Sequence, residues 1–433
     1  MKFFWLTAFV GLSTGVILSP VFPLTLLAAL LSLFKKRHLI VFAIFFCLGN
    51  FLASIQRISG PCEIVGYATM ERPNYVIATN VKGFSNGEWK KILHSVKIYS
   101  EGIRAGEKFY AVGRLGFQFA YPSLVMKADF GSSTRYGNEG FEKLHSKLID
   151  FKRRIVDFFQ ESVPDYAEQL STLVFSDPSF DASQAERVRK SGLAHLFAVS
   201  GLHVGIVYTL FDLLVSLFTH SLFVRRSLST LLTFMFALMT GPSPSALRAA
   251  TMLAVWNLFR LIDYPIEPLN LLGLVATMNL LFEPFVVLSP SFLMSYSAAA
   301  TLVAIQERLK ELNGAIKNLL ISLLALAGVA PFLLLFSTLN LFAPLFSIPA
   351  ILIATLILWA CVLVMFLLTM NLQSAAAMLI RGATPLFWSL QGLIDLSSKF
   401  LNLSGNFVLY SISSALLLFL LWHFGQSPKN FTS

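Results

Sequence analysis

Charged residues are scarce in this sequence. Only 13% of its 433 residues are Asp, Glu, Lys or Arg, whereas 56% are hydrophobic. A soluble domain carries about 25% charged residues, because charges must cover its surface. The shortage of charge therefore excludes an ordinary soluble protein, and the 41 phenylalanines agree with side chains that face lipid.

Cysteine is almost absent as well. Cys47, Cys62 and Cys361 are far apart, so the sequence offers neither a disulfide framework nor the spacing of a metal site. His195 and His203 have no third ligand at close spacing, which argues against a zinc site. We therefore expect no metal and no other cofactor.

Several catalytic patterns are missing too. The phosphate-binding pattern GxxxxGK[ST] is absent, which excludes the usual loop for ATP hydrolysis. HExxH is absent, and Ser200 is not preceded by the glycine of a GxSxG nucleophile elbow. The sequence therefore predicts a protein that is not an enzyme.

Long apolar runs are what the sequence has instead. A run of about 20 apolar residues can cross a bilayer as a helix. We predict a polytopic α-helical membrane protein with about nine to eleven membrane helices, and a less apolar, interfacial helix over 372–400. The expected spans are about 3–19, 21–34, 39–55, 193–218, 227–241, 244–262, 268–283, 285–305, 316–338, 341–369 and 402–424.

One segment near the N-terminus has a different pattern. Between residues 61 and 135, five short stretches of alternating polarity are separated by Gly, Asn and Pro, which predicts a small OB-like β-barrel. Its Lys and Arg outnumber its Asp and Glu, so its aromatic rings could stack the bases of a single strand. The alternative, which we expect for any one ring, is that they fill the barrel core. These aromatic residues are Tyr67, Tyr75, Phe84, Trp89, Tyr99 and Tyr110.

The positions of basic residues predict the topology. Lys35, Lys36 and Arg37 lie in a short loop between apolar runs and should be cytoplasmic, which places the β insert outside the cytoplasm. Residues 141–161 repeat apolar side chains at steps of three and four, so we expect an amphipathic helix on the membrane or on the barrel. The expected parts are N-terminal membrane helices (1–56), an extracytoplasmic OB-like domain (57–138), an amphipathic helix and linker (139–191), a second membrane domain (192–425) and a tail (426–433).

Polar residues interrupt the apolar run at 191–207. The segment contains His195, Ser200, Gly201 and His203, and polar groups in a membrane helix usually face a bundle interior or a water-filled path. On one continuous helix the two histidines would be about 80° apart around the axis, with Ser200 on the same side as His203. The alternative is that these groups bond to neighbouring helices and only fix packing.

A second interruption spans residues 240–252. Two prolines precede Arg248, which enters an apolar run and needs an anionic partner there, such as a carboxylate or a passing phosphate. Asp212 and Glu283 are the nearest acids within the apolar part of the chain. The alternative is that Arg248 extends to the lipid headgroups.

These segments together resemble a known family. GLAHLFAVSGLHVGIV (192–207) is similar to the signature of the ComEC family of DNA-internalisation (competence) proteins. GPSPSALRAATM (241–252), EPLNLL (267–272) and the proline-rich segment at 330–350 follow in the family's order. The likeness covers about residues 1–370, and it makes the second membrane domain a competence-type membrane channel domain.

The resemblance implies a function that composition could not give. The family moves one strand of transforming DNA across the cytoplasmic (inner) membrane, so we expect a channel for single-stranded DNA. Many members carry a C-terminal metallo-β-lactamase-like domain, whereas this sequence shows no HxHxDH-type cluster; a nuclease would then be a separate polypeptide. The residues expected to line the DNA path are His195, Ser200, Gly201, His203, Ser245 and Arg248.

Other functions stay open at this point. A small-solute transporter is one alternative, and an intramembrane hydrolase using Ser200, His203 and Asp212 is another. Asp212 lies half a helical turn away from His203 on an ideal helix, which disfavours the hydrolase. The expected partners are single-stranded DNA and the lipid bilayer. Further candidates are an extracytoplasmic DNA receptor, a separate nuclease, a cytoplasmic helicase motor and a second copy of the chain in a homo-oligomer.

Overall fold

The structure is a computed structural model of the 433-residue chain. The predicted apolar run at 21–34 and the basic loop at 35–37 lie outside the residues that it describes, which are 4–17, 41, 44–49, 51–52, 59–85, 87–92, 94–118, 121–135, 139–177, 180–240, 244–305, 314–336, 338–400, 402–404, 409 and 412–416.

The chain forms two compact units, and each is built from two stretches of sequence. Unit 1 comprises Met1–Ile155 and Arg226–Phe292, and unit 2 comprises Val156–Arg225 and Leu293–Ser433. The second polar motif therefore belongs to unit 1 and the first to unit 2. The five-part division expected from composition stays a prediction.

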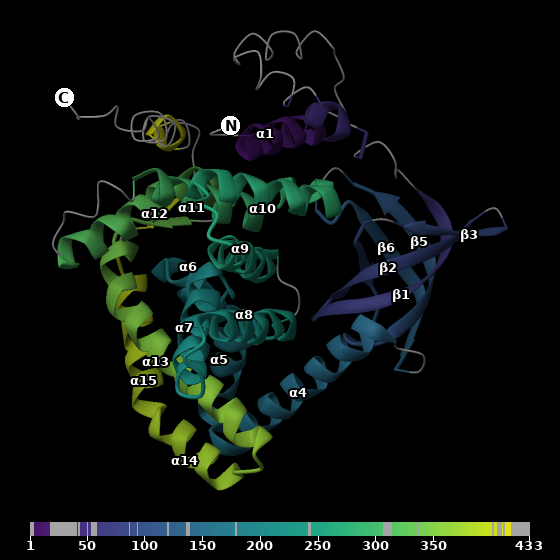
Figure 1. Ribbon diagram of the computed structural model, residues 1–433. Helices are drawn as coiled ribbons and strands as arrows, with labels where there is room; N and C mark the ends of the chain where they lie inside the picture. The colour runs from purple at the N-terminus through teal and green to yellow at the C-terminus, as the bar shows by residue number, and fades with distance from the viewer. Residues whose placement is uncertain are drawn as a thin grey trace, which may run out of the picture. The chain divides into compact units, whose positions relative to one another are not determined.

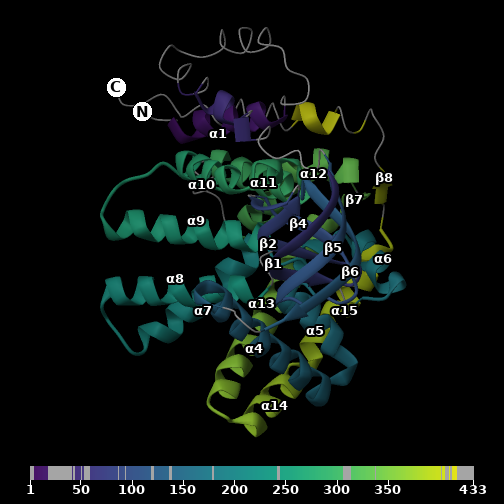
Figure 2. The ribbon, with the colours of Figure 1, turned by 90° about the vertical axis from the view of Figure 1, so that its right-hand side faces the viewer.

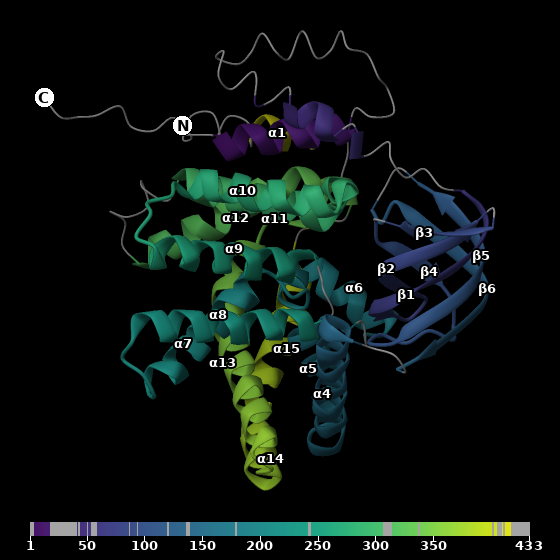
Figure 3. The same ribbon diagram turned by 45° about the vertical axis from the view of Figure 1, so that its right-hand side comes forward.

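Unit 1 contains the predicted β-barrel (Figures 1 and 3). Its ring closes through the pairings β1–β2, β2–β4, β4–β6, β6–β5 and β5–β1, and β4–β6 is the parallel one. Numbered along the chain, the five ring strands run 1-2-3-5-4, which is the Greek-key order of an OB-fold and confirms the expected fold. The strands are β1 (Gly60–Arg72), β2 (Tyr75–Ser85), β3 (Glu88–Ile92), β4 (Val96–Tyr99), β5 (Lys108–Phe117) and β6 (Leu124–Thr134).

One strand was not predicted. β3 (Glu88–Ile92) pairs antiparallel with β2, with Phe84 opposite Trp89. Gly87 in the connecting turn has φ +83°, a conformation that glycine adopts without steric cost. An Asn-Gly pair between such stretches is a strong hairpin signal, and the expectation of five strands overlooked it because the β3 sequence is mostly charged.

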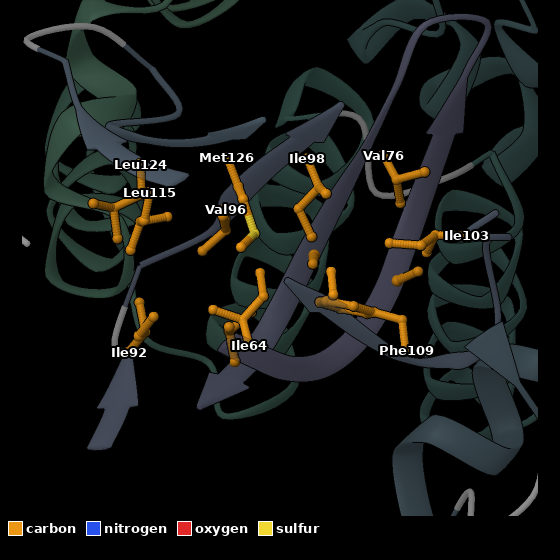
Figure 4. Packing of buried hydrophobic residues seen from close by; sticks show 14 of the residues in the cluster. Ile64, Val76, Ile92, Val96, Ile98, Ile103, Phe109, Leu115, Leu124 and Met126 are labelled. Carbon is orange, nitrogen blue, oxygen red and sulfur yellow. The ribbon is translucent and has the colours of Figure 1, made fainter. Parts of the chain in front are cut away.

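Branched aliphatic side chains fill the barrel (Figure 4). Figure 4 shows Ile64, Ile98, Leu115 and Met126 pointing into a common interior together with Phe109. Full burial of one such side chain contributes about 1.5–3 kcal/mol. The aliphatic core therefore closes the barrel without the six aromatic rings singled out above.

The amphipathic helix is confirmed as α4 (Gly140–Ser162), and it packs on the barrel. The Tyr67 hydroxyl donates to the Glu142 carbonyl at 3.0 Å and lies 2.9 Å from Nδ1 of the buried His145. The expected apolar face is wrong in the first turn, where Phe141 and Leu144 are exposed. The buried face is displaced because the helix contacts the barrel through His145 and Ile149, which lie on a neighbouring side of the helix.

Four further helices belong mainly to unit 1. In α1 (Phe4–Ile17), the Trp5 amide donates to Asn270 Oδ1 of α10 (Pro268–Phe282) at 2.9 Å. A Cβ on Gly273 would lie 2.5 Å from the Leu6 nitrogen, so these two helices approach closely. In α9 (Pro244–Leu261), Asn257 donates to Thr230 of α8 (Leu222–Met239) at 2.8 Å. The helices of unit 1 are thus joined by side-chain hydrogen bonds as well as by apolar packing.

Unit 2 is mainly helical, and Figure 2 shows its short β7–β8 pair at one side. The expected span 193–218 is broken before α7, 285–305 is divided into η2 (Pro284–Leu288) and α11, and 372–400 forms two helices instead of one. Residues 402–404 of the last expected span form β8, and most of that span lies outside the described residues. The elements are α5 (Pro164–Phe175), α6 (Ala182–Ser191), η1 (Ala194–Leu196), α7 (Gly201–Ser216), α11 (Pro290–Ile305), α12 (Gly314–Phe336), β7 (Thr338–Asn340), α13 (Ala343–Thr369), α14 (Gln373–Gly382), α15 (Thr384–Ser398) and β8 (Asn402–Ser404).

Three of the described helices are long and apolar enough to cross a membrane. They are Leu222–Met239, Ile316–Leu335 within α12, and Ala343–Thr369, and four shorter apolar helices accompany them. The predicted class, a helical membrane protein with a β-barrel insert, is confirmed. The expected number of crossings remains a prediction.

We expect acidic pH to destabilise the contact between α4 and the barrel. Burial lowers the pKa of His145 to about 4; the Leu238 carbonyl opposes this shift and the Lys152 charge adds to it. A free imidazole titrates near about 6.5, so between about pH 6.5 and 4 the unfolded chain binds a proton that the folded chain does not. His145 should therefore contribute a fall of about 3 kcal/mol in the free energy of unfolding from pH 7 to pH 4, measured as the difference between the unsubstituted protein and His145→Gln by hydrogen exchange of the barrel amides.

Two histidine variants test this assignment. His145→Gln should remove this contribution, and the buried His94, whose pKa is also lowered by burial, acts in the same direction. His220→Gln changes an exposed side chain between α7 and α8 and should leave the pH dependence intact. An unchanged slope in His145→Gln would contradict the assignment.

Candidate functional site

The first polar motif is a broken segment of unit 2 and not one continuous helix. α6 ends at Ser191, and Gly192 caps it in the left-handed conformation with φ +72°. The short turn η1 follows, and α7 begins at Gly201. The expected arrangement of His195 and His203 on one helix is therefore wrong, because nine residues of irregular chain separate the two helices.

Asn340 holds this break in place. Its Nδ2 donates to the Lys190 carbonyl at 2.9 Å and to the Ser397 carbonyl at 3.0 Å, and its Oδ1 accepts from the Phe342 amide at 2.9 Å. The Ser397 hydroxyl donates to the Ser191 carbonyl at 2.8 Å. Asn340 is 2% exposed, so one buried side chain satisfies the backbone ends of three separate segments.

Gly192 fits where a larger residue would not. A Cβ at this position would lie 2.6 Å from Cβ of Ala343 and 3.1 Å from Cβ of Asn340. The start of α13 thus rests directly on the backbone of the break. Both the positive φ and the close approach require glycine.

Ser200 and His203 form a pair at the start of α7. Ser200 precedes the helix in an extended conformation, and its Oγ lies 3.2 Å from Nδ1 of His203 in a hydrogen bond. His203 is buried, whereas His195 is exposed and its Nδ1 lies 3.2 Å from the Gly192 carbonyl. The motif therefore combines one accessible histidine with one buried histidine.

The second polar motif places Arg248 inside unit 1. Arg248 is 4% exposed, its Nη2 donates to the Ser291 carbonyl at 2.7 Å, and its guanidinium lies 5.3 Å from the centre of the Phe292 ring. The alternative that Arg248 extends to the headgroups does not hold for this buried side chain. Ser245 is half-buried in the first turn of α9. Arg248 thus contacts the carbonyl and the hydroxyl of Ser291 and an aromatic face.

The two acids expected near Arg248 have other partners. Asp212 accepts from Nε of Arg225 at 2.8 Å and pairs with its Nη2 as well. Oε1 of Glu283 accepts from the Ser95 amide at 2.6 Å and from the Ser95 hydroxyl at 2.5 Å. Burial and, to a smaller extent, the Glu283 charge raise the pKa of Tyr121, and the Arg248 charge acts in the opposite direction.

The comparisons with known proteins identify the family. A family model described as "Competence protein" matches residues 173–426, which is more than half of the 433 residues. The chain belongs to the competence protein family. The match includes both polar motifs, and the family implies a role in DNA uptake.

Two curated proteins are similar to this family member. ComE operon protein 3 of Bacillus subtilis (strain 168) is 26% identical over 201 residues, which are 45% of this chain and 25% of that protein. An uncharacterized protein of Aquifex aeolicus (strain VF5) is 31% identical over 196 residues, which are 43% of this chain and 46% of that protein. The chain thus spans less than half the length of either relative. No solved structure matches.

The barrel of this competence family member carries aromatic rings on its outside. Trp89, Tyr99 and Tyr110 are exposed, so the expectation that they fill the core is wrong, whereas Tyr67 is buried. Lys97 lies 4.0 Å from the centre of the Tyr75 ring and 4.9 Å from that of Tyr99. Aliphatic side chains already fill the interior of the barrel, so these exposed rings lie on its outside.

Basic residues continue this arrangement across the sheet. Tyr99 of β4 is opposite Lys127 of β6, which is opposite Arg114 of β5, and paired residues share one face. Lys127 and Arg114 are both exposed. We call Tyr75, Lys97, Tyr99, Lys127 and Arg114 the outer row.

Sequence reasoning missed two structural contributors to these sites. Asn340 lies about 150 residues from the break that it holds, and no local pattern signals such a contact. Glu283 joins α10 to the barrel through Ser95, and an acid within an apolar run was its only signal. Among the described residues, no group of three or more His, Cys, Asp or Glu is placed to hold a metal.

We expect Gly192→Ala to destabilise unit 2 strongly. The added methyl group would meet Ala343, and alanine in the left-handed region costs about 1–2 kcal/mol before the overlap is counted. The total loss of unfolding free energy should be at least about 2 kcal/mol, measured as a lower midpoint of thermal unfolding in detergent. Gly205→Ala is the matched control, because nothing lies within 4 Å of its added Cβ; equal destabilisation by both changes would contradict this account.

Proposed function

We propose that this chain forms the membrane path for one strand of DNA during uptake. The observation that carries the proposal is the broken segment between α6 and α7, in the part of the chain that matches the family. Non-helical backbone at membrane depth is tolerated where it is buried in protein or lines a wet cavity. The exposed His195 beside this break supplies a polar contact for such a path.

The path is proposed to act by passage and not by catalysis. A hydrolase using Ser200 and His203 needs a carboxylate to orient the imidazole, but Asp212 is bound to Arg225. Without such a carboxylate, the hydrogen bond between Ser200 and His203 at the start of α7 does not make an activated nucleophile. A separate helicase motor would then drive transport, and any nuclease would also be a separate polypeptide.

The outer row of the barrel is proposed to receive the strand before it enters the membrane. Stacking on tyrosine is tolerant of base sequence, and lysine and arginine neutralise the phosphates. Tyr75, Lys97 and Tyr99 provide both within one cluster. This role requires the barrel to face outward from the cytoplasmic membrane, as the basic loop at 35–37 predicts.

His195→Ala should lower DNA uptake at least about tenfold if His195 lines the path, since a change of about 1.4 kcal/mol in a transport barrier gives that factor. The measurement is uptake of labelled DNA by a transformable host in which this chain replaces the host's own family member. His220→Ala changes another exposed histidine of unit 2 and should leave uptake unchanged. Normal uptake in both variants, at equal protein levels, would remove His195 from the path.

Variants of the outer row should weaken DNA binding in two distinguishable ways. Tyr99→Ala should cost about 1–3 kcal/mol of stacking per base, and Lys97→Gln should reduce the slope of log K against log salt by about 0.7. Fluorescence anisotropy of a labelled single-stranded oligonucleotide with the whole protein in detergent measures both. The matched controls are Tyr264→Ala and Lys90→Gln, which change exposed residues outside the row. Binding that is insensitive to salt and to both variants would leave the barrel a structural part only.

A further inference from the structure

A cavity of about 180 Å³ lies in unit 2, where α5, α6 and α15 meet the residues around η1. It is smaller than the sites of about 300–1,000 Å³ that hold drug-sized molecules. Its walls combine aromatic rings with amides and one cation, chiefly Phe180, Phe197, Phe387, Gln184, Gln391 and Arg187. The mixture distinguishes this cavity from the empty voids of protein interiors, which are lined by apolar side chains.

The aromatic part of the cavity offers ring faces. Phe180 and Phe197 lie edge to face with ring centres 5.0 Å apart, and the buried Phe387 of α15 stacks with one face on Tyr166, with ring centres 5.6 Å apart. Phe197 is in the irregular chain directly after η1, so the cavity borders the broken segment itself. A planar ligand could lie against these rings.

The polar part offers hydrogen bonds that the protein does not use. Oε1 of Gln184 is buried and has no hydrogen-bond partner among the described residues. Gln391 on α15 and Gln169 on α5 bring further amides to the same cavity. A primary amide both donates and accepts, so this wall complements a ligand whose edge carries donors and acceptors together.

The charged and amide side chains in the lining exclude some classes of ligand. Arg187 is accompanied in the lining by the carboxylate of Asp395, which disfavours an isolated phosphate. The amides disfavour a lipid acyl chain, because a buried amide without a hydrogen-bond partner destabilises the complex. A flat heterocycle whose edge carries both donors and acceptors can stack on the aromatic rings and also form hydrogen bonds with the amides.

We infer that this cavity accepts one nucleobase of the DNA strand, stacked on the phenylalanines and bonded to Gln184 and Gln391. The inference rests on the proposed passage of DNA and adds a base-holding step at the entrance of the path. α6 is strongly polar, with Arg187, Arg189 and Lys190 exposed, so the cavity opens at a water-facing level. Amide contacts with both donor and acceptor groups would hold any base, as transport of arbitrary sequence requires.

The test compares two oligonucleotides of equal length, one with normal bases and one with abasic sites throughout. Protein that carries both Tyr75→Ala and Tyr99→Ala, in detergent, is used as the background, because these changes remove both tyrosine rings of the outer row. In that background, Gln184→Ala and Gln391→Ala together remove the two proposed amide contacts and should weaken binding of the normal oligonucleotide about five- to hundredfold. Binding of the abasic oligonucleotide should not change.

Controls separate this inference from the proposed function. Gln373→Ala on α14 changes an exposed glutamine outside the cavity and should have no effect. If the background protein binds both oligonucleotides equally and the glutamine variants change nothing, the base site is overturned while a phosphate-guided path stands. If neither oligonucleotide binds even to the protein without substitutions, the proposed function itself fails.

A photoreactive base locates the contact. An oligonucleotide carrying 4-thiothymidine should cross-link to Phe180, Phe197 or neighbouring residues, and the glutamine variants should lose this product. Cross-linking confined to the barrel would overturn the inference. Loss of the cross-link in the presence of a deoxynucleoside monophosphate alone would identify a free nucleotide as a second source of the same base.

Discussion

A backbone group that cannot reach water must find its partner within the protein, and this requirement shapes unit 2. The chain breaks between α6 and α7, so the carbonyls at Lys190 and Ser191 have to be satisfied from elsewhere. Asn340 and Ser397 supply those hydrogen bonds from segments distant in sequence. The polar motif around His203 can exist in an apolar chain because these buried amide and hydroxyl groups support it.

The same requirement explains the polar residues of unit 1. Arg248 donates to a backbone carbonyl at the start of α11, and Glu283 accepts from Ser95 at the edge of the barrel. The buried Arg248 and the half-buried Glu283 thereby each connect two elements. A charge that appears functional from sequence can have a structural partner first, and Glu283, proposed as the partner of Arg248, is an example.

In the barrel, the residue types that are present do not by themselves decide which side chains are buried. Aliphatic side chains fill the closed ring, so tyrosines on β2 and β4 remain outside, next to Lys97. Alternation along a strand predicts which residues share a face, but not which face is inside. Closure of the ring decides that, and it leaves Tyr99 and Tyr110 exposed whereas Tyr67 is buried.

The sequence alone determined the class of this protein. Apolar runs, alternating strands and the three-and-four spacing of 141–161 depend on local chemistry, and they predicted the helices, the OB-like barrel and α4. The order of its motifs indicated the competence family, which the family comparison confirmed. Local patterns were sufficient because apolar side chains recur every three or four residues in a half-buried helix and every two residues in a half-buried strand.

Only the tertiary structure decided how the polar residues are used. The left-handed break at Gly192 depends on Ala343 and Asn340, about 150 residues later in the chain, and the partner of Glu283 is on a strand loop almost 190 residues earlier. Such contacts produce no periodic pattern in the sequence, because each one pairs a single group with a single distant residue. For that reason the sequence located the motifs around His203 and Arg248, whereas their geometry followed from packing.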